Sequence, residues 1–271
     1  MPPVLLPVTP HAVLTREIES LCDDLLAGGA AERWLAAARR CRALAAPLDG
    51  YLAGTTTPPS DALRALEAET HRVDWDRSFE DGQTGARLER EMVSGALEGQ
   101  FLRMLVAISG ARRVLEVGVF TGYSALAMAE ALPEGGLLVG CERDPFAAAF
   151  ARQQFARTAA GAKIDLRVGA GADVLARLAD EGLAFDLVFV DADKTGYLGY
   201  FRTLLDRDLV RPGGVICVDN TLYKGEVYAA GAVSETGEAL RLFNRAVADE
   251  PRVEQVVLPL RDGLTIIRRV A

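Results

Sequence analysis

The chain has 271 residues, of which 50% are hydrophobic, and its formal net charge is −8. This length can bury one substantial core with a small appendage. An acidic balance without a basic cluster argues against nucleic acid or an anionic membrane as the main partner. The start lacks a basic segment before an apolar run, and no later stretch approaches the roughly 18 apolar residues of a membrane span. We therefore expect a cytoplasmic protein.

The rare residue types restrict the available chemistry. Four cysteines, at 22, 41, 141 and 217, have neither zinc-ligand spacing nor the spacing of a short disulfide framework, so we expect buried thiols. Both histidines precede residue 80, so a base in the rest of the chain must be a carboxylate, a lysine, a tyrosine or a metal-bound group. Lysine occurs only at 163, 194 and 224, where arginine would otherwise supply the charge. A lysine here is therefore a candidate for a role that requires losing a proton.

The N-terminal third has a helical pattern. Residues 1–12 are expected to form an irregular lead that contains prolines. Apolar residues then recur at three- and four-residue steps from 14 to about 51, with a break at Gly28 and Gly29, which predicts two amphipathic helices. A linker at 54–59 precedes Ser60, a favourable N-cap for a helix over 61–71. We interpret this region as packing against the core or a partner, with a lid over an active site as the alternative.

Strands and helices alternate in the remainder of the chain. A helix over 96–109 precedes predicted strands at 113–119, 137–142, 164–168, 185–191 and 214–219, with helical stretches between them. This alternation indicates βαβ units and a parallel sheet with helices on both faces. Residues 253–260 and 263–269 predict a hairpin joined by Arg261-Asp-Gly. The predicted fold is α/β and Rossmann-like, with a seven-stranded, mostly parallel sheet that ends in an antiparallel hairpin. We place a helical extension at 1–84 and the main domain at 85–271.

The turn after the first strand has features of a nucleotide-type cofactor site. Gly118 and Gly122 allow the backbone to approach a ligand, and the following helix directs its amide end toward it. Gly-x-x-x-Gly alone is weak evidence, because tight strand-to-helix turns occur throughout α/β folds. Glu116 is the unusual residue, because it is an acid inside an apolar strand.

Polar or small residues follow every predicted parallel strand, at the edge where open sheets bind ligands. Glu142 follows the second strand, where an acid accepts both hydroxyls of a cofactor ribose. Gly169 and Gly171 follow the third strand and are small enough to admit an adenine edge.

The fourth and fifth strands end in oxygen-bearing side chains. Asp191, Asp219 and Asn220 offer two carboxylates and an amide carbonyl, which suit Mg²⁺ or Ca²⁺ and poorly suit zinc or copper. An Asp-x-Asp after a strand is a common loop feature, so the Asp219-Asn220 pair is what favours the metal interpretation. Three protein ligands leave about three octahedral positions for water and a bidentate substrate.

Five motifs carry a family resemblance. They are Met92-Val-Ser94, Glu98-Gly-Gln-Phe101, Leu115-Glu-Val-Gly-Val-Phe-Thr-Gly-Tyr-Ser124, Phe189-Val-Asp-Ala-Asp-Lys194 and Val218-Asp-Asn-Thr-Leu222. In order and spacing these resemble the caffeoyl-CoA O-methyltransferase-like family of cation-dependent enzymes that use S-adenosylmethionine. The resemblance covers about residues 85–271, and the closing hairpin is typical of class I methyltransferases rather than dehydrogenases.

The resemblance implies roles for the matching residues. Those implied at the cofactor are Ser94, Glu116, Gly118, Val119, Ser124, Glu142, Gly171, Asp191 and Asp193. Those implied at a divalent cation are Asp191, Asp219 and Asn220. Lys194 resembles the general base of the related catechol methyltransferases and would act beside Asp191. In the competing account, cation binding alone acidifies the acceptor, and Lys194 only pairs with Asp193. A homodimer is also implied.

The acceptor is indicated by departures from the family and by a narrower likeness. Ser94 replaces a threonine and Glu142 an aspartate, and both changes keep the donor or acceptor type. Tyr223 replaces the tryptophan of plant members, which weakens the case for a phenylpropanoid acceptor. The N-terminal helices, residues 88–100, 123–132 and 252–263 resemble the O-methyltransferases of mycosporine biosynthesis, which form 4-deoxygadusol from its demethylated precursor. The expected function is methyl transfer to one oxygen of a vicinal diol or enediol.

Three alternatives remain open. The first is a catechol- or caffeoyl-type phenolic methyltransferase. The second is a nicotinamide-dependent oxidoreductase, although the turn from Gly118 to Gly122 lacks its tighter Gly-x-Gly-x-x-Gly. The third is a protein that binds S-adenosylmethionine without turnover and acts on a partner through its helical N-terminus.

Overall fold

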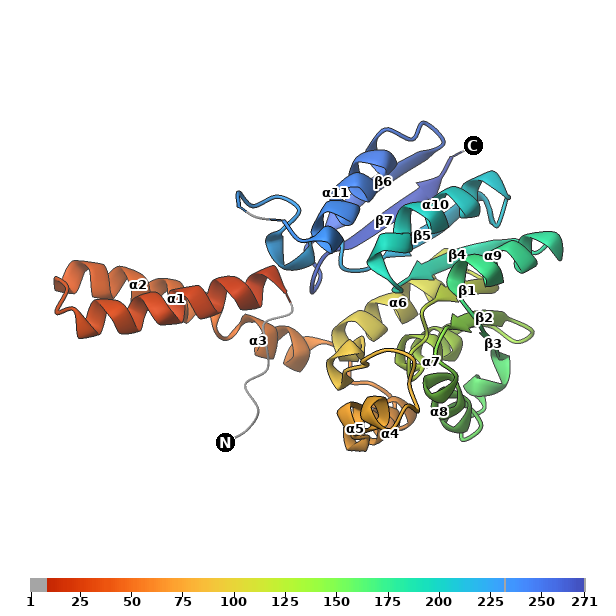
Figure 1. The fold of residues 1–271 in the computed structure, drawn as a ribbon, viewed down its shortest axis with the longest axis horizontal. Coiled ribbons are helices and arrows are strands. Elements are labelled where there is room, and N and C mark those ends of the chain that lie inside the picture. The colour runs from red at the N-terminus through yellow and green to blue at the C-terminus, as the bar shows by residue number, and fades with distance from the viewer. Residues whose placement is uncertain (1–8, 232, 271) are drawn as a thin grey trace.

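A seven-stranded sheet forms the centre of the molecule in a computed structural model that describes residues 9–231 and 233–270 (Figure 1). The strand order is β3-β2-β1-β4-β5-β7-β6. The strands are β1 Arg113–Val117, β2 Leu137–Glu142, β3 Ile164–Val168, β4 Phe185–Val190, β5 Val210–Val218, β6 Val253–Leu258 and β7 Leu264–Arg269. The first five pair in parallel, and β7 pairs antiparallel with both β5 and β6. The predicted fold class is confirmed.

Helices cover both faces of the sheet, as the strand periodicity requires. Val114 faces a core formed with α6 (Gly95–Ser109), α7 (Tyr123–Ala131) and α8 (Pro145–Phe155). The neighbouring Leu115 and Val117 face a second core formed with α9 (Gly171–Asp180), α10 (Tyr197–Asp206) and α11 (Glu235–Ala248). Because side chains alternate along a strand, Glu116 points to the same side as Val114, toward α7. Burial on both faces explains the nearly continuous apolar strands.

The order in which successive strands are added to the sheet changes side between β1 and β4, which remain parallel. The connections from β1 lead outward through β2 to β3, whereas β4 lies on the other side of β1 and leads to β5. Such a switch point opens a crevice at the carboxyl ends of the two strands. The exits of β1 and β4 touch there, because a Cβ on Gly118 would lie 2.0 Å from the carbonyl oxygen of Asp191.

The N-terminal region contains five helices in its described part: α1 Pro10–Ala27, α2 Glu32–Ala45, α3 Leu48–Thr55, α4 Asp61–Arg72 and α5 Trp75–Glu80. The predicted irregular lead over 1–12 is wrong from Pro10 onward, because the Thr9 side chain caps α1 by accepting from the Ala12 amide at 3.0 Å. Residues 1–8 of that lead lie outside the described part. The stretch 14–51 forms parts of three helices rather than two, because α2 ends before Pro47, which has no amide hydrogen to donate. Ser60 caps α4 as predicted, accepting from the Leu63 amide at 3.2 Å.

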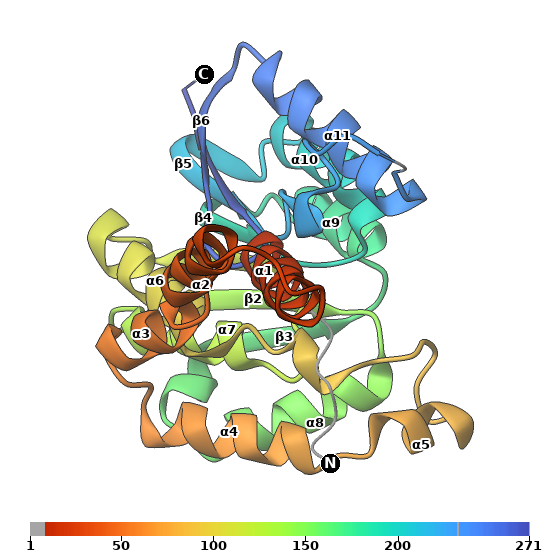
Figure 2. The same ribbon diagram turned by 90° about the vertical axis from the view of Figure 1, so that its left-hand side faces the viewer.

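The N-terminal helices divide between an extended hairpin and the core. The hairpin of α1 and α2 extends away from the sheet in Figure 1 and is seen end-on in Figure 2. In contrast, Leu63 and Leu66 of α4 are buried in the same core as α7. The division into an extension over 1–84 and a main domain remains a prediction.

The cysteines differ in their exposure to solvent. Cys22, Cys141 and Cys217 are buried, but Cys41 is exposed, so the expectation of buried thiols is wrong at this position. Cys41 lies on the outward face of α2, where nothing in the described chain covers it. No helix of the described residues is long and apolar enough to cross a membrane.

Candidate active site

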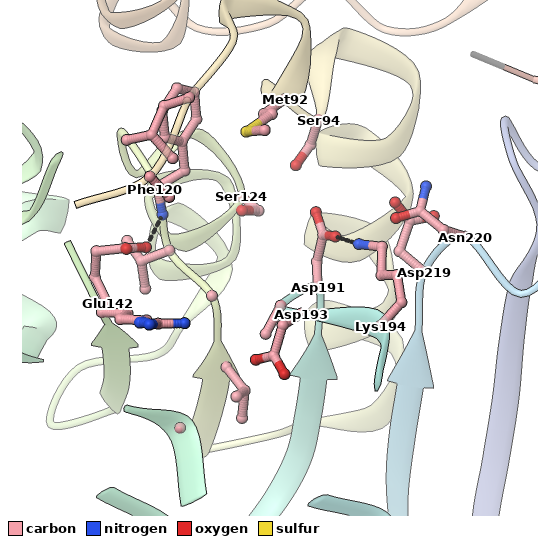
Figure 3. Close-up of a pocket in the computed structure, with 18 of the residues that line it drawn as sticks. Met92, Ser94, Phe120, Ser124, Glu142, Asp191, Asp193, Lys194, Asp219 and Asn220 are labelled. Atoms are coloured by element: carbon pink, nitrogen blue, oxygen red, sulfur yellow. Dashed lines mark hydrogen bonds and ion pairs between the residues drawn. The ribbon is translucent and has the colours of Figure 1, made fainter. Parts of the chain in front are cut away.

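A cavity of about 750 Å³ lies at the carboxyl ends of the parallel strands (Figure 3). The residues from the sequence motifs that line it are Ser94, Gly118, Val119, Ser124, Glu142, Gly171, Asp191, Asp193, Lys194, Asp219 and Asn220. The structure thus brings together all but one of the predicted site residues, from the ends of β1 to β5 and the start of α6. The exception, Glu116, lies beneath the cavity floor.

The floor of the cavity depends on two glycines in the left-handed region. Gly118 has φ 94° and Gly122 has φ 97°. A Cβ on Gly122 would meet the Phe155 ring at 2.5 Å, so this turn requires glycine for both its conformation and its packing. The amide of Gly118 donates to the Cys141 carbonyl at 3.0 Å, which ties the turn to β2.

Glu116 is completely buried behind this floor. The Ser124 hydroxyl donates to its Oε1, and its Oε2 has no hydrogen-bond partner among the described residues. Burial raises the pKa of Glu116 well above its ordinary value, and the charges of Asp191 and Glu142 add to the rise, against the Ser124 bond. An unsatisfied buried carboxyl oxygen fits a ligand that brings a cationic donor, such as the amino group of S-adenosylmethionine.

Glu142 is fixed at the other side of the floor by two backbone amides. Its Oε2 accepts from the Phe120 amide at 2.6 Å, and its Oε1 accepts from the Asp144 amide at 2.8 Å. Burial raises the pKa of Glu142 from its ordinary value, whereas these amide bonds lower it. Each oxygen retains a second lone pair, so the carboxylate fits the two adjacent hydroxyls of a ribose.

Lys194 pairs with Asp191 and not with Asp193. The Lys194 Nζ lies 2.7 Å from Asp191 Oδ1, whereas Asp193 accepts from the Tyr200 hydroxyl at 2.5 Å. The Lys194–Asp193 pair of the competing account is therefore wrong. Burial alone would lower the pKa of Lys194, but Asp191 and the neighbouring Tyr197 raise it above the ordinary value. The role of Lys194 as a base remains a prediction.

Asp219 and Asn220 supply oxygen atoms beside Asp191, to the right of it in Figure 3. Asp219 is buried, and its Oδ1 has no partner within the described chain. Burial and the nearby Asp191 raise the pKa of Asp219 to about 7. Asn220 adopts φ 60°, and its side chain lies near enough to Asp262 to help lower the pKa of that carboxyl against the rise that burial causes. Two like charges and an unsatisfied oxygen fit a hard divalent cation.

The carboxylates of this site do not form a metal site by themselves. Among the described residues, no cluster of three or more His, Cys, Asp or Glu side chains has metal-ligand spacing. Binding at Asp191 and Asp219 would therefore need the Asn220 amide and oxygens from water or substrate.

Other residues of the site were not anticipated from the sequence. Arg261, in the β6–β7 turn, donates to the Ser94 carbonyl and pairs with Glu98 at 2.6 Å. Asp262 of the same turn accepts from the Lys224 amide at 2.5 Å. Arg-Asp-Gly is a turn signal, and nothing local in it indicates a contact with α6. Thr9 also lines the cavity, and α1 contacts the turn Tyr223–Gly225, a location that suits the lid alternative.

The strand order, the switch-point cavity and the acid after β2 define a Rossmann-like class I methyltransferase. Residues 81–270 match the O-methyltransferase family, and the chain belongs to it. It is 38% identical over 190 residues to the caffeoyl-CoA O-methyltransferase of Petroselinum crispum, an alignment that covers 66% of this chain and 78% of that protein.

Solved structures agree with this assignment. The O-methyltransferase TomG of Streptomyces achromogenes, involved in tomaymycin synthesis and solved with SAM, is 30% identical with a TM-score of 0.70. A Podospora anserina methyltransferase bound to SAH is 28% identical with a TM-score of 0.71. The matches cover 83% of this chain and 96% and 95% of those chains, respectively. The chain is thus an S-adenosylmethionine-dependent O-methyltransferase that resembles the caffeoyl-CoA type, and the oxidoreductase alternative is wrong.

Proposed function

We propose that this enzyme methylates one oxygen of a vicinal diol or enediol that is chelated by a divalent cation, Mg²⁺ or Ca²⁺. The observation that carries the proposal is the buried, unpaired Oδ1 of Asp219 beside Asp191 and Asn220, in the same cavity as Glu142. Hard oxygen ligands at one end and a ribose-type acid at the other fit a chelated acceptor facing a nucleoside cofactor.

The cofactor end is assigned to the residues around the β1 turn. Glu142 would accept the ribose hydroxyls, and Glu116 with Ser124 would face the amino-acid end. The backbone would approach the cofactor at Gly118, Val119 and Gly171. Ser94 would lie near both the cofactor and the cation, and Asp193 near the methionine part of the cofactor. The support for this assignment is that Gly118, Val119 and Gly171 line the same cavity as Glu142 and that Glu116 has an unpaired oxygen.

Methyl transfer from a sulfonium needs in-line alignment and a deprotonated acceptor oxygen. A bound cation would lower the pKa of the acceptor hydroxyl and fix its orientation. Asp191, Asp219 and Asn220 would hold the cation and, through it, the acceptor. Lys194, 2.7 Å from Asp191, would receive the proton if the bound cation lowers the lysine pKa that Asp191 raises, and the competing account assigns acidification to the cation alone.

The acceptor we favour is the demethylated precursor of 4-deoxygadusol, on the motif likeness to mycosporine-pathway enzymes. A phenolic acceptor is the second candidate, because the matched relatives include caffeoyl-CoA O-methyltransferases and the tricin synthase 1 of Oryza sativa. Tyr223 lines the cavity and contributes to the acceptor wall in either case.

One assay with two arms tests the proposal. Methyl transfer from S-adenosylmethionine is measured on the demethylated deoxygadusol, catechol and caffeoyl-CoA, with Mg²⁺ or with excess EDTA. We expect transfer to at least one acceptor and its loss in EDTA, with Asp219→Asn as the matched variant that loses a carboxylate without a change in size. Undiminished transfer in EDTA would remove Asp219 and Asn220 from the mechanism. SAH binding without transfer to any diol would favour the non-catalytic alternative.

A further inference from the structure

Arg261 extends into the cavity from an unusual backbone position. It lies in the β6–β7 turn with φ 50°, a left-handed conformation that non-glycine residues adopt rarely. Its side chain is 25% exposed and lines the cavity together with Asp219 and Lys194. A large charged side chain kept at a strained turn position needs an explanation beyond closing a hairpin.

The guanidinium is anchored on one side only. Its Nη1 donates to the Ser94 carbonyl and to Glu98 Oε2, the latter at 2.6 Å. Its Nε and Nη2 form no hydrogen bond with any described residue. Because the anchored Nη1 fixes the plane of the group, the two remaining nitrogens form a preoriented donor pair that can be reached from the cavity.

The charges around Arg261 favour an anion. Arg261 interacts with the carboxylates of Glu98, Asp191 and Asp219, and Lys194 interacts with the last two. With all five groups ionised, their net charge is −1, and a divalent cation bound at Asp219 would change it to +1. A singly charged acceptor would then restore neutrality in a region that is largely shielded from water.

We propose that Arg261 selects an acidic acceptor, one that carries a delocalised oxyanion next to its vicinal oxygens and binds it through Nε and Nη2. The oxyanion is either a carboxylate or the ionised enol of a vinylogous acid. This rests on the proposed function, because it assigns the chemical class of the diol at the same site. Arginine suits the task because its planar fork stays charged and matches a delocalised oxyanion, which a lysine ammonium does not.

The test compares acceptors that differ mainly in acidity. The probes are neutral catechol, 3,4-dihydroxybenzoate for the carboxylate, and reductic acid, a cyclic enediol, for the ionised enol. Binding is measured by calorimetry on the full-length enzyme with SAH and Mg²⁺, and kcat/KM is measured with S-adenosylmethionine. We expect at least one acid to bind about 10- to 100-fold more tightly than catechol, as a charge-assisted bidentate pair predicts.

The informative variant is the double substitution Arg261→Gln with Glu98→Gln, which removes both members of the ion pair and leaves no buried charge unpaired. We expect it to lose the preference for the acid while its affinity for catechol stays unchanged. Arg261→Lys should keep part of the preference. Lys224→Gln removes another cation of the cavity wall and should keep the preference, which controls for net charge.

Two results would overturn the assignment: equal affinity for catechol and both acids in the unaltered enzyme, or equal losses for acid and catechol in the double variant. Efficient methylation of catechol without an acid preference would refute only the role of Arg261. Tight acid binding without methylation of any probe would retain that role and remove the proposed function.

Discussion

The contact between the ends of β1 and β4 can be tested by adding a single methyl group. A Cβ on Gly118 would lie 2.0 Å from the Asp191 carbonyl oxygen and 3.0 Å from the Ala192 Cα. Both atoms belong to the backbone, so no side-chain rotation can relieve the overlap. Gly118→Ala must therefore push the β4 exit away from the cofactor floor and displace Asp191 with it.

The size of the effect follows from two costs. A non-glycine residue in the left-handed region costs about 1–2 kcal/mol, and overpacking of a filled site costs about 1–3 kcal/mol. The free energy of unfolding should thus fall by about 2–5 kcal/mol. Since one kcal/mol shifts the Tm of a chain of this size by about 2–4 °C, we expect a Tm lowered by about 4–20 °C.

Gly110 provides the matched control. It has φ 65° at the end of α6, and a Cβ there would have nothing within 4 Å. Gly110→Ala therefore carries only the backbone cost of about 1–2 kcal/mol. Scanning calorimetry gives the two Tm values, and titration calorimetry gives SAH affinity, which should fall at least about tenfold in Gly118→Ala alone. Equal Tm losses in both variants, with SAH affinity intact, would refute the close contact at the switch point.

Four further predictions concern the site and the assembly. Lys194→Arg keeps the charge, but a guanidinium does not lose its proton and cannot act as a base. Turnover should therefore fall about 100-fold with SAM affinity unchanged, and retained turnover would contradict the base role. Glu116→Gln should raise the Kd for SAM by about 10- to 100-fold without lowering Tm, and an unchanged Kd would separate this residue from the cofactor. Asp262→Ala removes the carboxyl that interacts with the Asn220 side chain and should weaken Mn²⁺ binding, followed by electron paramagnetic resonance, by about 10- to 100-fold; unaltered binding would exclude its orienting role. Light scattering should show a homodimer. Leu14 on α1 is 56% exposed, so Leu14→Glu should favour the monomer, and an unchanged dimer would show that this face of α1 is not the interface.

The sheet was predictable because its signals are local. Apolar strands flanked by turns mark each element, and the alternation with helices determines that the strands run in parallel. The predicted first strand extended past Val117 because Val119 in the turn after it is also apolar. The predicted fourth strand extended past Val190 because Asp191 directly follows an apolar run. The start of β5 at Val210 was missed because Pro212, Gly213 and Gly214 disguise its first half.

The polar site was predictable only where it follows the sheet. The strand ends placed Glu142, Asp191 and Asp219 at one edge, and the structure brings them to one cavity. The Glu98–Arg261 pair, in contrast, joins residues 163 positions apart, and neither helical periodicity nor a turn signal specifies such a partner. The position of Glu116 below the floor likewise depends on how α7 packs, which the strand pattern does not define.

The C-terminal hairpin does more than complete the fold, because it shapes the exit of β5. Asn220, Tyr223 and Lys224 all have positive φ, a conformation that costs free energy unless the surroundings impose it. The hairpin imposes it: the Leu222 amide donates to the Asp262 carbonyl at 2.9 Å, and the Lys224 amide donates to the Asp262 carboxylate. Asp262 also interacts with the Asn220 side chain. We therefore expect a residue 42 positions downstream, outside the strand-exit motifs, to orient this proposed cation ligand. The same turn carries Arg261, so we expect substitutions of these two consecutive hairpin residues to alter both cation binding and acceptor choice without touching the cofactor floor.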